Sequence, residues 1–330
     1  MDDVSAAVRG LIGGMEVAEF NREVRERCAQ RFTAALRPAE VGQLGSVARL
    51  ESMFRSETVP MLNVDIYSQG SLMRLMDVQK KSGKTYLGIV ADSFRRGSTI
   101  RVRDVDRYDL RLREFQAEVQ RYFAAQSQIN LYLTPPGASG FPPHFDITDV
   151  FVVQCVGAKE WKVFECYTNQ TDLPLPETDW DPERFQPCGA AKSLRLCAGD
   201  VLYLPRGVMH QAFCTDRESL HLTVSIEPLT VVDLLAKALR AAAAKDPALR
   251  GRVRWSLEDA GAEGGELAAA LADHMKSVMD RIDVEELLKP ERARLAGQFE
   301  PGSGRELQSI IDSFADRPKA SADHVFLAPE

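Results

Sequence analysis

The fold is decided by the stretch INLYLTPPGASGFPPHFDITDVFVVQCVGAKEWKVFE, residues 129–165. It begins a series of short apolar runs separated by turns that carry proline or glycine. These runs lie at 129–133, 149–156, 160–165, 192–205 and 219–226. Many short strands with such turns are typical of a β-sandwich or a β-barrel. The sequence therefore predicts a mainly β core over about residues 128–228.

The chain before this core has a different pattern. Residues 15–55 show helical periodicity, and residues 60–105 are expected to form short strands and turns because glycines interrupt them. A further amphipathic helix is expected over 107–126. Its apolar residues near one face are Leu110, Phe115, Val119 and Phe123.

Strand-like runs end at Pro228, and helical patterns follow. These patterns cover 231–244, 264–282, 284–299 and 305–314. The change in composition near residue 229 predicts one domain at 1–228, which contains the β core, and a helical domain at 229–330. The helices have apolar faces broad enough for a homodimer contact, although packing against the core would use the same faces. The residues on these faces are Leu234, Leu235, Leu239, Leu267, Leu271, Met275 and Met279.

Composition narrows the class of protein. The 330 residues are 45% hydrophobic and 27% charged, which is ordinary for a globular chain. A net charge of −7 argues against generic binding of nucleic acid, which needs a basic surface. The six cysteines show no C-x-x-C spacing and are interpreted as structural thiols. Because the sequence shows neither a secretory signal nor a long apolar span, we expect a cytoplasmic protein without membrane contact.

One cluster of charge stands out at 95–113, where seven arginines accompany three aspartates. Two interpretations are open. The cluster is either a solvated face with internal ion pairs, which are common and weak, or a surface that receives an acidic peptide or ribosomal RNA.

The segment PPHFDITD contains an H-x-D pair, His144 and Asp146, and His210 follows the turn LPRGVMH. Residues i and i+2 of a strand point to the same face, so one imidazole and one carboxylate can converge on one point. Two histidines and one carboxylate on one side of a metal leave three coordination positions open, an arrangement that suits non-haem Fe(II) and O₂. The three residues are therefore the candidate metal ligands.

The stretch 129–165, together with AGDVLYLPRGVMHQAF (198–213) and SLHLTVSI (219–226), resembles the JmjC-type ribosomal oxygenases. The resemblance implies a double-stranded β-helix of the cupin type, with iron on His144, Asp146 and His210. It also implies 2-oxoglutarate as cofactor, O₂ as co-substrate and a protein or peptide as substrate. In this family a cation in the G-x-K/R-x-W stretch pairs with the far carboxylate of 2-oxoglutarate, and Lys159 occupies that position.

Further residues follow from the resemblance. Tyr132 and Ser225 match positions that hydrogen-bond the substrate side chain in members that hydroxylate histidine. Asn130 shares a strand face with Tyr132 and is expected to line the cofactor pocket. His221 is interpreted as a structural strand residue, because a fourth protein ligand would fill a site that cofactor and O₂ need.

The resemblance favours hydroxylation at Cβ of a histidine in a ribosomal protein or in a ribosomally made natural-product precursor. Three alternatives stay open at this point. They are an arginine hydroxylase of a ribosomal protein, a JmjC lysine demethylase, and a cupin that binds a metal without oxygenase activity. The likeness is dense only over about residues 128–240, so the substrate is less constrained than the iron chemistry.

Overall fold

A computed structural model describes most of the first 251 residues of the chain. The described residues are 3–68, 71–164, 174, 186–187 and 189–251, with isolated helical positions between 272 and 293. The predicted helices at 264–282, 284–299 and 305–314 lie outside them, apart from those isolated positions. No helix of the described part is long and apolar enough to cross a membrane.

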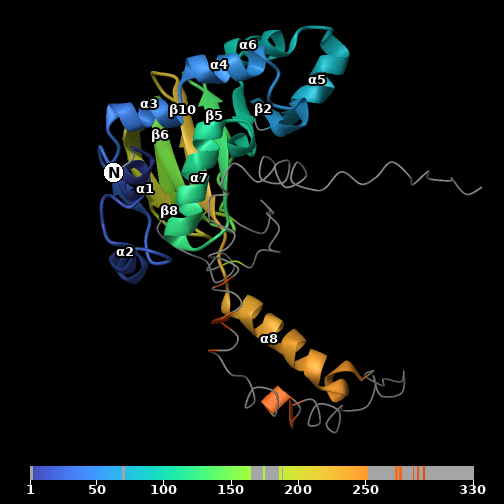
Figure 1. Cartoon of the computed structure of the whole chain (residues 1–330). Coiled ribbons are helices and arrows are strands. Elements are labelled where there is room, and N and C mark those ends of the chain that lie inside the picture. Colours follow the sequence, from blue (N-terminus) through green and yellow to red (C-terminus); the bar gives the residue numbers. More distant parts are fainter. Residues whose placement is uncertain are drawn as a thin grey trace, which may run out of the picture.

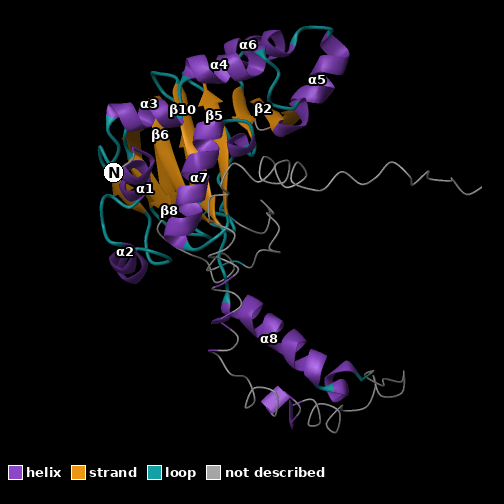
Figure 2. Ribbon diagram, in the orientation of Figure 1, coloured by secondary structure: helices purple, strands orange, loops and turns teal. Residues whose placement is uncertain are grey.

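The centre of the molecule is a large antiparallel sheet (Figures 1 and 2). Its strands lie in the order β1-β8-β6-β10-β5-β4-β2-β3, and β7 and β9 pair with β6 outside this path. The strands are β1 (Gln30–Phe32), β2 (Val64–Ser68), β3 (Ser71–Arg74), β4 (Thr99–Val102), β5 (Ser127–Thr134), β6 (Asp149–Phe164), β7 (Ala191–Cys197), β8 (Val201–Leu204), β9 (His210–Phe213) and β10 (Ser219–Ile226).

Strand β6 belongs to two sheets. Its first half pairs with β8 and β10 in the major sheet, and its second half pairs with β7 and β9 in a minor sheet. Gly157 lies between the halves with φ +68°, and a Cβ there would come within 1.8 Å of the Glu218 carbonyl oxygen. Only glycine fits this bend. The two sheets form the predicted double-stranded β-helix.

Helices cover the outer face of the major sheet (Figure 2). The α-helices are α1 (Asp3–Leu11), α2 (Val17–Glu23), α3 (Pro38–Leu44), α4 (Val47–Arg55), α5 (Leu75–Ser82), α6 (Tyr86–Arg95), α7 (Leu110–Phe123) and α8 (Val231–Lys245). Short 3₁₀ helices lie at η1 (Met61–Asn63), η2 (Val105–Arg107) and η3 (Pro247–Arg250). Phe20 and Phe115 from the helices join Phe151 and Leu222 from the strands in one apolar core.

Helix α7 confirms the helix expected over 107–126. The Asp109 side chain caps it by accepting the backbone N–H groups of Arg111 and Leu112 at 2.9 and 3.1 Å. Phe115, Val119 and Phe123 are buried as expected. Leu110 is 70% exposed, however, and Leu112 is buried in its place. The helix begins at Leu110, so this residue precedes the face that packs on the sheet.

Two expectations for the first hundred residues were wrong. Helical periodicity over 15–55 is broken by β1, which pairs with β8, and by Pro38 at the first position of α3. Residues 60–105 contain the helices α5 and α6 besides strands. Two glycines there belong to helix ends: Gly83 ends α5 with φ +63°, and the Gly88 N–H is accepted by the Thr85 hydroxyl that caps α6.

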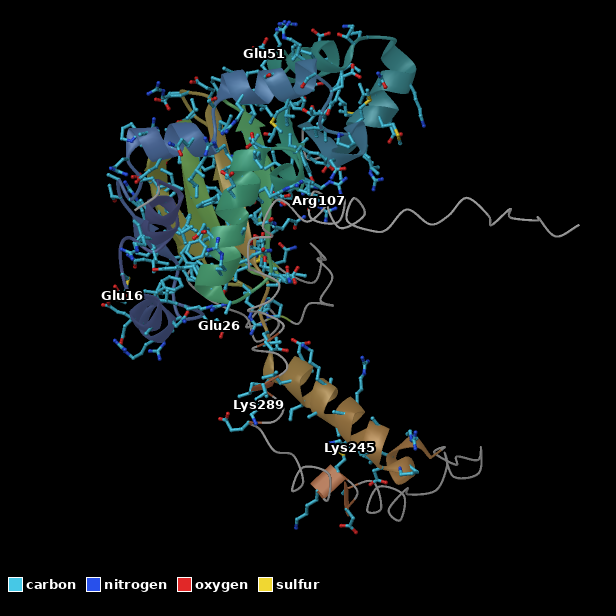
Figure 3. The ribbon with its side chains drawn as sticks, viewed as in Figure 1. Glu16, Glu26, Glu51, Arg107, Lys245 and Lys289 are labelled. Atoms are coloured by element: carbon cyan, nitrogen blue, oxygen red, sulfur yellow. The ribbon has the colours of Figure 1, made fainter. Side chains whose placement is uncertain are left out.

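Helix α8 extends away from the sheets, and the side chains toward Lys245 lie far from the body that carries Glu51 (Figure 3). It confirms the helix expected at 231–244. A capping box formed by Thr230 and Asp233 starts it. Among its described side chains only Ala238 is buried. The boundary near residue 229 remains a prediction that fits this arrangement.

Candidate active site

A pocket with a cavity volume of about 80 Å³ lies between the two sheets. The major sheet contributes residues of β5, β6 and β10, and the minor sheet contributes residues of β6 and β9. Every candidate residue from the sequence lines this pocket. They are Asn130, Tyr132, His144, Asp146, Lys159, His210 and Ser225. The fold therefore brings together residues that are up to 95 positions apart, from Asn130 to Ser225.

The ligand atoms of His144, Asp146 and His210 lie within 4.8 Å of one another, so one metal ion can reach all three. Nε2 of His210 lies 3.6 Å from Oδ2 of Asp146. His144 and Asp146 stand in the extended loop between β5 and β6 rather than on a strand. The expected i, i+2 relation between the two side chains still holds, because an isolated β-bridge pairs His144 of this loop with His210 of β9.

Backbone hydrogen bonds fix this loop. The N–H of His144 donates to the His210 carbonyl at 3.0 Å, and the His210 N–H donates back at 2.7 Å. The N–H of Gly207 donates to the Asp146 carbonyl at 2.8 Å. The three candidate ligands are thus held by main chain that does not depend on a bound ion.

The two histidines are oriented in the same way. Nδ1 of His144 lies 2.9 Å from the Pro142 carbonyl oxygen, and Nδ1 of His210 lies 2.9 Å from the Val208 carbonyl oxygen. Since a carbonyl only accepts, both Nδ1 atoms carry the proton and both Nε2 lone pairs face the pocket. Such outer hydrogen bonds fix the tautomer that a metal needs.

Burial and the neighbouring His144 lower the pKa of His210 to about 4, despite the nearby Asp146 carboxylate. His210 is therefore neutral at physiological pH and available as a ligand without losing a proton.

Lys159 lies in the interior rather than at an exposed hairpin tip. Its side chain is 3% exposed, and Nζ donates to the Thr134 hydroxyl at 3.0 Å. Among the described residues no carboxylate forms an ion pair with it. Burial lowers its pKa to about 8. A buried amine without a counter-ion is costly unless an anion completes the site.

Three residues in or beside the pocket are not predicted from the sequence to contact a ligand. Thr134 is fully buried and accepts both the Lys159 ammonium and the Thr99 hydroxyl, the latter at 3.2 Å. Nε1 of Trp161 and Nδ1 of His221 are buried and have no hydrogen-bond partner in the described part of the chain. Strand alternation offered a signal for Thr134, because it follows Tyr132 by two residues on the same face.

His221 lies outside the metal cluster, in agreement with its interpretation as a strand residue. Its ring stacks on Tyr132 with centroids 4.9 Å apart and an interplanar angle of 4°. Burial, and secondarily the Lys159 charge, lower its pKa well below the usual value. His221 is therefore a neutral imidazole that stacks on the tyrosine.

Tyr132, Asn130 and Ser225 line the wall formed by β5 and β10. Burial raises the pKa of Tyr132, so its hydroxyl stays protonated, and it hydrogen-bonds with Arg101 and Thr223. The side-chain oxygen of Asn130 accepts the Asp104 N–H at 3.1 Å, which leaves its amide N–H₂ for the pocket. This wall presents uncharged hydrogen-bonding groups.

Comparison with known proteins agrees with this geometry. Residues 106–234 match the model of the JmjC domain. Ribosomal oxygenase 1 of Gallus gallus is 32% identical over 223 residues, which cover 66% of this chain and 36% of the relative. A bifunctional lysine-specific demethylase and histidyl-hydroxylase NO66 of Dictyostelium discoideum is 32% identical over 197 residues, covering 58% of this chain and 38% of the relative. The chain thus spans little more than a third of these curated relatives.

Among solved structures, YcfD, a ribosomal oxygenase from Escherichia coli in complex with cobalt and 2-oxoglutarate, is 16% identical with a TM-score of 0.48. The match covers 86% of this chain and 70% of that one.

Proposed function

Because residues 106–234 form a JmjC domain related to those of ribosomal oxygenases, we propose that this chain is an iron(II)- and 2-oxoglutarate-dependent oxygenase. Its substrate is a side chain of a protein or peptide. The observation that carries the proposal is the pairing, within one pocket, of a two-histidine, one-carboxylate cluster with a buried lysine that has no described carboxylate partner.

The residues present fit both groups. His144, Asp146 and His210 hold the metal and leave three positions for other ligands. Lys159 offers its ammonium to the far carboxylate of 2-oxoglutarate, and the Thr134 hydroxyl lies beside it. The unpartnered atoms of Trp161 and His221 give a polar cofactor further hydrogen-bonding positions. Asn130 is the remaining candidate for contact with the cofactor.

When bound, iron(II) would activate O₂, and 2-oxoglutarate would supply two electrons as it is converted to succinate and CO₂, so that one oxygen atom enters the succinate and the other hydroxylates an unactivated C–H bond. The protein contributes placement and exclusion of water. Val150, Val152 and Leu204 line the same pocket as the metal ligands and contribute apolar side chains to its wall.

The charges of the pocket support a neutral target side chain. Among the described lining residues, Asp146 is the only carboxylate, and it is committed to the metal. A substrate arginine or methyllysine would therefore enter without a counter-ion, at a cost in desolvation. The Tyr132 and Ser225 hydroxyls can instead bond an imidazole. We therefore propose Cβ hydroxylation of a histidine, with the arginine and demethylase alternatives as outcomes of the test.

The substrate remains a protein or peptide. The name of one curated relative, ribosomal oxygenase 1, supports a ribosomal protein, and a ribosomally made natural-product precursor is the rival. The iron-loaded chain is incubated with histidine-containing peptides of both kinds, 2-oxoglutarate and O₂. We expect a gain of one oxygen on a histidine, matched by succinate. His210→Ala abolishes it, whereas Gln211→Ala, which changes the adjacent residue outside the pocket, retains it.

Other results would redirect the proposal. Formaldehyde release from methyllysine peptides indicates a demethylase, and oxygen on arginine indicates the arginine branch. Metal binding without 2-oxoglutarate turnover indicates a cupin of another class.

Exposed apolar residues support the homodimer expected from the sequence. Val231 and Val232 at the start of α8 are 73% and 58% exposed, and Leu239 is 42% exposed. Sedimentation of the full chain tests this: a dimer for the wild type and a monomer for Val232→Glu are expected. A wild-type monomer rejects the dimer and leaves the oxygenase proposal unaffected.

A further inference from the structure

The inner face of the major sheet continues beyond the pocket across three more strands. Register places Tyr132 of β5 opposite Arg101 of β4, Arg101 opposite Asp65 of β2, and Asp65 opposite Arg74 of β3. Residues directly opposite each other lie on the same face of a sheet. Arg103 follows the end of β4 and reaches the same face, since its Nε lies 3.1 Å from Oδ2 of Asp65. Arg74, Arg101, Arg103 and Asp65 are called the arginine shelf below.

The shelf carries more positive than negative charge. Asp65 is 1% exposed, and its Oδ2 lies 2.6 Å from Arg101 Nη2 and 3.1 Å from Arg103 Nε. This single carboxylate is therefore shared by two guanidinium groups. Arg74 is exposed and makes no ion pair among the described residues, even though Asp77 follows within one helical turn. Three arginines thus face one aspartate.

The shelf adjoins the pocket through aromatic contacts. Phe141 lines the pocket, and its ring lies 3.9 Å from that of Tyr67 and 5.4 Å from the Arg101 guanidinium carbon. Tyr132 lines the pocket and hydrogen-bonds Arg101. A chain that leaves the pocket over β5 therefore meets the shelf next.

We propose that the arginine shelf binds an acidic residue of the substrate chain and thereby selects the sequence around the modified side chain. This inference rests on the proposed function. From β5 to β3 there are three steps of about 4.8 Å, or about 14 Å. An extended chain covers about 3.3 Å per residue, so the aspartate or glutamate that meets Arg74 stands about four residues from the target.

The paired state of the surrounding arginines favours a peptide over RNA. Arg95 pairs with Asp92 and Arg111 pairs with Glu114, so these two members of the cluster at 95–113 already have carboxylate partners. They fit the interpretation of a face with ion pairs, whereas Arg101 and Arg103 of the shelf fit that of a surface for an acidic peptide. The chain has a net charge of −7, whereas an RNA-binding surface needs many unpaired cations.

A peptide library tests the shelf. Each peptide has one central histidine and randomised flanking residues. One sample is incubated with the iron-loaded chain, 2-oxoglutarate and O₂, and the peptides that gain oxygen are sequenced. A second sample is passed over the zinc-loaded chain with 2-oxoglutarate, and the retained peptides are sequenced without any turnover. A short RNA is added to the second sample as a competitor.

We expect aspartate and glutamate to be enriched about two- to fivefold near the fourth position on one side of the histidine. Arg74→Glu shifts the enrichment to lysine and arginine, and Arg74→Gln abolishes it. Both variants keep the basal turnover of 2-oxoglutarate. The control Arg22→Glu changes an exposed arginine on α2, outside the shelf, and leaves the enrichment unchanged.

The two proposals fail in different ways. Acidic enrichment among retained peptides, without oxygen gain in any peptide, contradicts the oxygenase and supports the shelf. Oxygen gain without acidic enrichment overturns the shelf alone. Three further results also overturn the shelf. The enrichment persists in Arg74→Glu, no peptide is retained, or RNA displaces the retained peptides at concentrations at which acidic peptides do not.

Discussion

The two faces of the major sheet are built from the same strands and differ in composition. On the outer face of β10, Leu220, Leu222 and Val224 are fully buried beneath the helices. The alternate residues His221, Thr223 and Ser225 face the pocket. On β5, Leu131 and Leu133 join the apolar core, whereas Asn130 and Tyr132 line the pocket.

This contrast separates stability from chemistry. The outer face buries large apolar side chains against helices, which supplies most of the free energy of folding. The inner face buries His221, and the minor sheet opposite it buries Lys159; both residues destabilise the apo protein unless a ligand satisfies them. Changes on the outer face should therefore lower stability, and changes on the inner face should lower binding.

The largest effect is expected on the outer face. Phe115 of α7 is fully buried, and Phe115→Ala removes an aromatic ring from the core. We expect the free energy of unfolding to fall by about 3–5 kcal/mol, measured by urea denaturation. The folded fraction should keep the 2-oxoglutarate affinity of the wild type. A loss of affinity in proportion to the loss of stability would contradict the separation of the two faces.

Lys159→Met makes the converse change on the pocket side, in the half of β6 that belongs to the minor sheet. It removes a buried charge and keeps most of the volume, so the apo free energy of unfolding should stay constant or rise by about 1–3 kcal/mol. The affinity for 2-oxoglutarate should fall roughly 10- to 100-fold, because a charge-assisted contact is lost. Calorimetry measures both. A destabilised variant with normal affinity would place Lys159 in a purely structural role.

The depressed pKa of Lys159 also predicts a pH dependence. Its folded-state pKa is about 8, against a reference value of 10.5. As pH rises through this window, the folded state loses the proton first, so the unfolded state binds more protons and stability rises. The stability of apo wild type should thus increase between pH 8 and 10.5 relative to Lys159→Met. If the stabilities of wild type and Lys159→Met change in parallel over this pH range, the lysine does not titrate within it.

The smallest change in stability is expected for the hydroxyl groups of the wall. Ser225→Ala and Tyr132→Phe should each alter the free energy of unfolding by about 1 kcal/mol or less. Oxygen transfer to a histidine peptide should fall roughly tenfold, with 2-oxoglutarate affinity unchanged. Steady-state assays with and without peptide separate these effects. If 2-oxoglutarate turnover without peptide falls as much as turnover with peptide, both residues act on the cofactor rather than on the substrate.

Much of the core followed from local sequence. Alternation in SLHLTVSI assigns each residue of β10 to a face, and the H-x-D pair with His210 identifies the candidate ligands. Lys159 is different, because nothing local distinguishes a buried lysine from an exposed one. Its interpretation came from family resemblance, and its burial is visible only once β6 is placed between β7 and β9.

Long-range pairing explains what the sequence did not reveal. The part played by Thr134 depends on Lys159 and Thr99 reaching it from other strands. Nothing in the local sequence distinguishes Arg74 from an ordinary surface residue, and its place opposite Asp65 follows only from the pairing of β3 with β2. In the same way, the glycines within 60–105 predict turns, although Gly83 and Gly88 mark a helix end and a helix start.

The central claim is tested most directly by anaerobic titration of the metal-free chain with iron(II) and 2-oxoglutarate, following the visible charge-transfer band of the chelate. Wild type should show the band, His210→Ala should lack it, and Lys159→Met should need roughly 10- to 100-fold more 2-oxoglutarate to form it. Gln211→Ala serves as the matched control and should behave as wild type. Bound iron without a band in the wild type would contradict the oxygenase assignment.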